Sequence, residues 1–299
     1  MNFSSLKAAS LYVLTALLLL TKSACSQTDI SNAAIQDSLS KFSSVIWKQK
    51  SDSGRLAANE FFFTKFKTAL EAKSSISLAL DSIKGITLTA SDDKKIRIFT
   101  WNIPLSDGSN KYFGFIQFIS DSSIIIPLKS NETVLGDFSQ AQVTPKLWYG
   151  AIYYKIIPVQ IGTKQAYTLL GWDGHTQTSN RKIIDMLAPD GKGDFVFGLP
   201  VFKTKAGIKS RVVIEYAEKA NMLLRYDYQT INIQKRKKIV KVDAWLIVMD
   251  RLIPMQPAME GMRKYYVPAG DTYDGYIFKN GYWVLAEDIE VANKLNGKK

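Results

Sequence analysis

Residues 276–285 read YIFKNGYWVL, and this stretch decides the fold class. Two runs rich in aromatic and β-branched residues flank the dipeptide Asn280-Gly281. Such runs are typical of strands, and Asn-Gly accepts the positive φ angles that a two-residue hairpin turn requires. The stretch therefore predicts an antiparallel hairpin near the C-terminal end of the chain.

The same two-residue periodicity extends upstream to residue 86, in short segments joined by turn-rich links. The strand candidates are residues 86–90, 96–99, 112–119, 147–157, 212–216, 224–229 and 239–249. We expect 212–216 and 224–229 to form one hairpin, and 239–249 to be a central strand with Trp245 in the core. Residues 180–187 are the exception, because they read as a short helix. Links without helices favour an antiparallel meander over a parallel α/β fold.

Before residue 86 the periodicity is helical. Ile35, Leu39, Phe42 and Ile46 recur at steps of four, three and four and so share one helix face. Gly85 follows as a plausible C-terminal stop. The expected fold class is therefore mainly β (α+β), with antiparallel meander sheets. A helical segment at residues 27–85 precedes an antiparallel β-rich domain at residues 86–299.

Residues 1–26 have the layout of a secretory signal peptide: a basic start, an apolar stretch at 8–20 and small residues after it. The apolar stretch is shorter than the ~20 residues that a membrane-spanning helix needs. Cleavage before Gln27 and lipidation of Cys25 are both open as processing routes. Either route predicts an exported protein of the periplasm, outer membrane or cell surface, which contacts a membrane only through a lipid on Cys25.

Composition excludes several classes of site. The chain has a single cysteine and a single histidine, so an internal disulfide, a cysteine-rich cluster and a multi-histidine metal centre are all excluded. It has neither a P-loop nor a Gly-x-Gly-x-x-Gly motif, and we expect no nucleotide, metal or other cofactor. The 39 basic and 27 acidic residues give a net charge of +12, which favours anionic partners.

The pattern of residues 273–288, with Gly-Trp-Asp-Gly at 171–174 upstream, resembles an uncharacterised family of exported proteins of Bacteroidetes-type bacteria. The resemblance covers most of the chain after residue 26 and is carried by turn and strand motifs. It implies a location in the cell envelope. That family has no assigned activity, so the resemblance implies no catalytic residue.

The segment around the single histidine offers a first candidate site. Asp173 could orient His175 as a general base, and Trp172 beside them could offer a flat face for stacking a sugar. The alternatives are a solvated histidine in an Asp-Gly turn and a tryptophan packed in the core.

A pair of carboxylates could cut a glycosidic bond if the two groups faced each other across a cleft. Asp271 and Asp274 are the candidates for such a pair. The alternative is that both lie solvated on the surface, as most aspartates do.

The densest basic run is Lys235-Arg236-Lys237-Lys238, between two strand candidates and hence at a predicted hairpin tip. The run could contact an anionic envelope polymer or polysaccharide, and a solvated tip is the alternative. An exported protein meets little nucleic acid, so that partner is not expected. These patterns predict a non-enzymatic binding or structural module of the cell envelope. The alternative is a carboxylate-dependent hydrolase of cell-wall or polysaccharide substrate.

Overall fold

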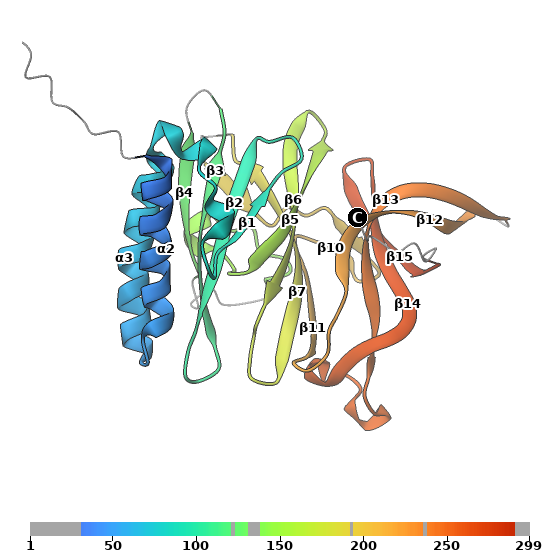
Figure 1. Ribbon diagram of the computed structural model, residues 1–299. Coiled ribbons are helices and arrows are strands. Elements are labelled where there is room, and N and C mark those ends of the chain that lie inside the picture. The colour runs from blue at the N-terminus through green and yellow to red at the C-terminus, as the bar shows by residue number, and fades with distance from the viewer. Residues whose placement is uncertain (1–30, 121–122, 131–137, 192–193, 236–237, 291–299) are drawn as a thin grey trace, which may run out of the picture.

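The computed structural model describes residues 31–120, 123–130, 138–191, 194–235 and 238–290, and shows four layers: a helix pair and three sheets, A, B and C (Figure 1). The helices are α2 (Asn32–Lys48) and α3 (Asp52–Glu71). Sheet A has the order β1 (Thr87–Ala90), β2 (Ile96–Pro104), β3 (Asn110–Phe118), β4 (Ile124–Lys129). The expectation of a mainly β, antiparallel fold with an N-terminal helical segment is confirmed.

Sheet B has the order β11 (Val212–Ala217), β7 (Ser179–Pro189), β6 (Lys164–Asp173), β5 (Ile152–Ile161), with β8 (Phe195–Phe197) paired to β7. Sheet C has the order β10 (Gly207–Lys209), β9 (Phe202–Thr204), β15 (Tyr282–Ile289), β14 (Tyr266–Lys279), β13 (Lys238–Pro254), β12 (Leu224–Lys235). Single 3-10 turns occupy Lys73–Ser77, Leu80–Ser82, Pro145–Leu147, Pro257–Met259 and Arg263–Tyr265. The pairings within all three sheets are antiparallel except β15 with β9, which is parallel.

The helix pair forms because local signals agree with the apolar stripe. The Ser31 and Ser51 hydroxyls cap α2 and α3 by accepting hydrogen bonds from the N–H groups of Ala34 and Gly54. Both helices pack on sheet A through a buried aromatic core. That core contains Phe62, Phe63, Phe66, Phe99, Trp101, Phe113 and Phe115.

Two further cores lie between the sheets. One joins sheet A to sheet B, around Trp148, Tyr153 and Phe197. The other joins sheet B to sheet C, around Phe202 and Trp283. Sheet B is therefore buried on both faces, which explains the apolar runs on β6 and β7.

The hairpin predicted at residues 276–285 is confirmed. Lys279 pairs with Tyr282, and the two turn residues, Asn280 and Gly281, have φ values of 51° and 79°. These positive φ angles are the ones that a twisted two-residue hairpin needs, so the dipeptide sets the register between β14 and β15.

Two predicted elements are wrong, and the strand predicted at 147–157 begins only at Ile152. Residues 180–187 are not a helix but most of β7, a strand covered on both faces, whose continuous apolar run gave no two-residue period. Residues 212–216 and 224–229 do not pair with each other. The first pairs with β7 in sheet B and the second with β13 in sheet C, so the chain changes sheets between them.

Candidate functional site

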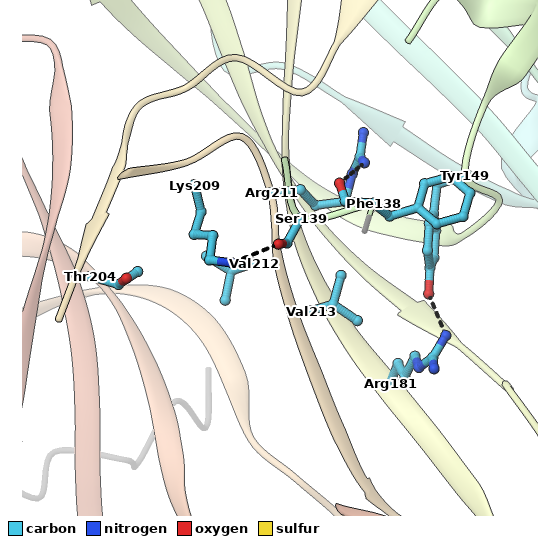
Figure 2. A pocket seen from close by; sticks show the side chains of 9 residues that line it. All are labelled: Phe138, Ser139, Tyr149, Arg181, Thr204, Lys209, Arg211, Val212 and Val213. Carbon is cyan, nitrogen blue, oxygen red and sulfur yellow. Dashed lines mark hydrogen bonds between the residues drawn. The ribbon is translucent and has the colours of Figure 1, made fainter. Parts of the chain in front are cut away.

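Two adjoining cavities lie beside sheet B. The larger, here called the cation cavity, has a volume of about 520 Å³, and the second, the carboxylate cavity, about 440 Å³. Phe138, Tyr149 and Arg181 line both, so the two form one continuous region. Figure 2 shows the nine side chains of the cation cavity: Phe138, Ser139, Tyr149, Arg181, Thr204, Lys209, Arg211, Val212 and Val213.

The cation cavity carries one sign of charge. Among its nine described lining residues are three cations, Arg181, Lys209 and Arg211, and no carboxylate. Arg181 comes from β7, Lys209 ends β10 and Arg211 directly precedes β11. The Lys209 Nζ donates to the Ser139 hydroxyl at 2.9 Å (Figure 2). Cations around one hollow attract an anion, and here Asp185 and Glu215, which pair with Arg211 and Arg181 from outside the lining, offset part of that charge.

Arg211 is fully buried. Its Nε donates to Asp185 Oδ2 at 2.7 Å and its Nη1 donates to the Phe138 carbonyl at 2.8 Å. Within the described part of the chain, its Nη2 has no hydrogen-bond partner. A buried donor without a partner is uncommon because its desolvation is costly. The Nε of Arg181, which also lines the cavity, is buried and unpartnered too.

Tyr149 connects the two cavities. Its hydroxyl donates to Asp173 Oδ2 at 2.9 Å and accepts from Arg181 Nη1 at 3.1 Å. The Phe138 ring meets the Tyr149 ring edge-on, with centroids 4.8 Å apart. Burial raises the pKa of Tyr149, and the charge of Asp173 raises it further. The Tyr149 hydroxyl therefore stays protonated, and its two hydrogen bonds connect Arg181 to Asp173.

Asp173 lies at the end of β6 and is buried. Its Oδ1 accepts a hydrogen bond from the Tyr112 hydroxyl at 2.9 Å, so each carboxylate oxygen accepts a hydrogen bond from one tyrosine. Tyr112 in turn accepts from the Gly174 N–H at 2.7 Å, which ties the turn after β6 to β3. Burial raises the pKa of Asp173, and the two tyrosine hydrogen bonds oppose this increase.

The structure brings His175 and Asp173 to the same carboxylate cavity. The structure shows no hydrogen bond between these two described residues. Asp173 therefore does not orient His175 as a general base. Burial lowers the pKa of His175, and repulsion from Arg181 lowers it further, while Asp173 and Glu215 act in the opposite direction. The imidazole is therefore neutral near pH 7.

The carboxylate cavity holds a second acid, Asp107, from the turn between β2 and β3. Hydrogen bonds from the hydroxyl and N–H of Ser109 lower the pKa of Asp107. Asp107 and Asp173 thus have pKa values displaced in opposite directions within one cavity.

The other predicted carboxylates lie elsewhere in the fold. Asp274, on β14, accepts hydrogen bonds from Arg251 and from the N–H of Asp288, so it belongs to a structural ion pair. Asp271 is exposed on the same strand. Trp172 lies half-buried on β6, next to the carboxylate cavity rather than among its lining residues.

The predicted basic run lies at the end of the β12–β13 hairpin, because Lys235 pairs with Lys238. Arg236 and Lys237 fall outside the described residues. So do the predicted signal peptide at residues 1–26 and the candidate lipidation site Cys25.

Sequence reasoning missed Tyr149, Arg181, Lys209 and Arg211, because they come from four separate segments that only the sheets bring together. One signal was present. Asp185 interrupts the apolar run at residues 183–187, and a charge at such a position needs a buried partner. The partner is Arg211.

The residues that the structure describes include no helix suited to crossing a bilayer and no group of three or more potential ligands placed to hold a metal ion. No protein-family model, curated protein or solved structure matches this chain.

Proposed function

We propose that this chain is an exported cell-envelope protein that binds an acidic polysaccharide, with the anionic group of a sugar in the cation cavity. One observation carries the proposal: three cations and no carboxylate among the nine described residues around a hollow of about 520 Å³. The signal-peptide pattern of residues 1–26 supports the location, and the net charge of +12 supports the class of partner.

The two arginines are suited to a carboxylate, sulfate or phosphate group. A guanidinium presents donors in a planar fork that matches two oxygens of such a group. Arg211 and Arg181 each keep one buried N–H without a hydrogen-bond partner among the described residues. These two N–H groups are buried and do not themselves reach a ligand. The support comes from side chains that are already held in place, Arg211 by Asp185 and Phe138 and Arg181 by Tyr149 and Glu215, which lowers the conformational cost of binding.

The adjoining carboxylate cavity supports a sugar as the carrier of that anion. Its lining includes Asp107, Ser109, Asn110 and Ser130, which offer hydrogen-bond donors and acceptors to hydroxyl groups. Tyr149, shared by both cavities, offers an aromatic surface at the junction. An acidic sugar next to a neutral one along a glycan would occupy the two cavities together.

We expect the substitutions Arg181→Gln and Lys209→Gln each to weaken binding of heparin and of lipopolysaccharide about tenfold, or about 1.4 kcal/mol. Each removes one charge from the cation cavity and leaves the buried Arg211–Asp185 pair in place. Fluorescence anisotropy with labelled ligand at low and high salt measures the affinity, which should fall as salt rises.

Lys164→Gln is the matched control, because Lys164 is exposed at the start of β6, next to the turn from β5, and it should change affinity less than twofold. The pKa of His175, measured by NMR, shows whether the ligand binds in this cavity. An anion beside Arg181 offsets the repulsion between Arg181 and the imidazole and should therefore raise the pKa of His175. Unchanged affinity in Lys209→Gln, combined with lost binding after neutralising residues 235–238, would assign the ligand to the hairpin tip and refute the proposal.

The export half of the proposal is tested at the mature N-terminus. Mass spectrometry of the protein recovered from the envelope of an expressing bacterium should find either a diacylglyceryl group on Cys25 or a chain that begins at Gln27. Recovery of the intact leader on folded protein in the cytosol would contradict export.

A carboxylate-dependent hydrolase is the second candidate function, because Asp107 and Asp173 line the same cavity. Release of reducing ends from a bound polysaccharide, lost in Asp107→Asn, would make the chain an enzyme. Binding without any release keeps it a binding protein.

A further inference from the structure

A third cavity lies at the opposite edge of sheet B from the cation cavity, and it is walled by aromatic rings. It has a volume of about 260 Å³. Its lining residues are Asp92, Lys155, Ile157, Pro158, Tyr226 and Trp245. Lys155, Ile157 and Pro158 come from β5, the edge strand of sheet B, and the rings come from β12 and β13. The cavity therefore lies in the angle between sheet B and sheet C.

One face of the β12–β13 hairpin carries three aromatic side chains, here called the aromatic platform: Tyr226, Tyr228 and Trp245. Tyr226 and Tyr228 are two residues apart on β12, and Tyr228 pairs directly with Trp245 on β13. The Tyr226 and Trp245 rings stack with centroids 5.1 Å apart and planes 25° apart, and Tyr228 lies 5.6 Å from Trp245. The three rings thus form one cluster, in which Trp245 stacks on Tyr226 and is tilted by 57° against Tyr228.

The platform is open to solvent, which overturns the expectation that Trp245 belongs to the core. Trp245 is 55% exposed and Tyr228 is 54% exposed. The physical reason is the length of the hairpin. Ile247, two residues along the same face from Trp245, is buried against sheet B, whereas Trp245 lies where that cover ends. Two large rings left in water on one face mark an interaction surface.

Polar groups border the rings, and the two charged residues that line the cavity, Asp92 and Lys155, have opposite signs. The Lys155 Nζ bonds to both oxygens of Asp92 at 3.2 Å, on one side of the cavity. Along the hairpin, the Thr230 hydroxyl donates to Asp243, in the pair that follows Tyr228 and Trp245 on the same face. A ligand that fits this arrangement is uncharged, has a flat apolar side for the rings and carries hydroxyls around its rim.

We infer that the aromatic platform binds a neutral pyranose of a glycan chain, whose C–H face stacks on Trp245 and whose hydroxyls bond to Asp92 and Lys155. An aromatic ring presents a negative face to the C–H groups of a sugar ring, while carboxylate and ammonium groups pair with its hydroxyls. This site is separate from the cation cavity and takes a different class of sugar.

Titration of the full protein with cellohexaose, laminarihexaose and chitohexaose, followed through the tryptophan indole N–H signals in NMR, tests the inference. At least one hexasaccharide should bind and shift the Trp245 signal. Trp245→Ala should weaken that binding about tenfold or more, and Trp245→Phe should retain part of it because a ring remains. Trp47→Ala is the matched control, since Trp47 is also partly exposed but lies on α2.

The two proposed sites are distinguishable. Lys209→Gln should leave hexasaccharide binding unchanged, and Trp245→Ala should leave heparin binding unchanged. Three outcomes would overturn the inference: no binding of any of the three hexasaccharides, equal affinity in Trp245→Ala, or a dimer in sedimentation that Trp245→Ala dissociates. The last would make the platform a contact between two copies of the chain.

Discussion

Replacing Arg211 by methionine is expected to lower the free energy of unfolding by about 3–5 kcal/mol. Arg211 and Asp185 are both fully buried, and the guanidinium Nε lies 2.7 Å from the carboxylate. Removal of the cation leaves the Asp185 charge in the protein interior with no ionic partner. The substitution also leaves the Phe138 carbonyl without a bond from Arg211. Urea denaturation followed by circular dichroism measures the loss.

Two further variants distinguish the loss of the buried ion pair from the general effect of losing a lysine or arginine side chain. Lys129→Met removes a pair with Glu60 in which both side chains are at least half exposed, and should cost less than about 1 kcal/mol. The double variant Arg211→Met/Asp185→Leu should be more stable than Arg211→Met alone, because it also removes the unpaired charge. Equal stability of Arg211→Met and Lys129→Met would contradict the buried pair.

The second large effect is expected at the contact between the helices and sheet A. Trp101→Ala should lower the free energy of unfolding by about 3–5 kcal/mol, because it empties the centre of a closed aromatic core. Trp101 is fully buried, and its Nε1 donates to Asn59 Oδ1 of α3 at 2.7 Å. Phe62 of α3 meets its ring edge-on at 5.4 Å. Urea denaturation gives the total, and hydrogen exchange of the α3 amides should accelerate most.

The control is Phe61→Ala, at a neighbouring position of α3 that is 51% exposed, where we expect a cost below about 1 kcal/mol. Trp101→Phe keeps a buried ring but loses the bond to Asn59 and part of the indole volume, so it should fall between the two. If Trp101→Ala destabilised the protein no more than Phe61→Ala, the helix pair would not be anchored through this core.

The parts of the fold that could be predicted are those set by neighbouring residues. The change from helical to two-residue periodicity at Gly85 and the turn at Asn280-Gly281 are encoded within a few positions, and both predictions are confirmed. Strand pairing is not local. Residues 212–216 alternate as a hairpin strand would, yet their partner is β7, because the buried faces of three stacked sheets decide which edges meet.

The candidate site shows the same limit. Asp173 and His175 stand two residues apart, so the sequence could suggest them, and both line the carboxylate cavity. Arg181 and Arg211 are thirty positions apart and come to line one cavity only because β7 pairs with β11. Trp245 shows a related error: apolar neighbours on both sides predict burial, but exposure depends on how far the hairpin extends past sheet B.

The parallel pairing of β15 with β9 has a consequence for the order of assembly. In sheet C the last described strand, β15, stands between β9 and β14, which precede it in the chain. The sheet therefore cannot close until nearly the whole described polypeptide is present, and its contacts span long sequence separations. Such topologies fold slowly. Slow closure of sheet C leaves the chain unfolded for longer after synthesis, which is the form that the proposed export requires.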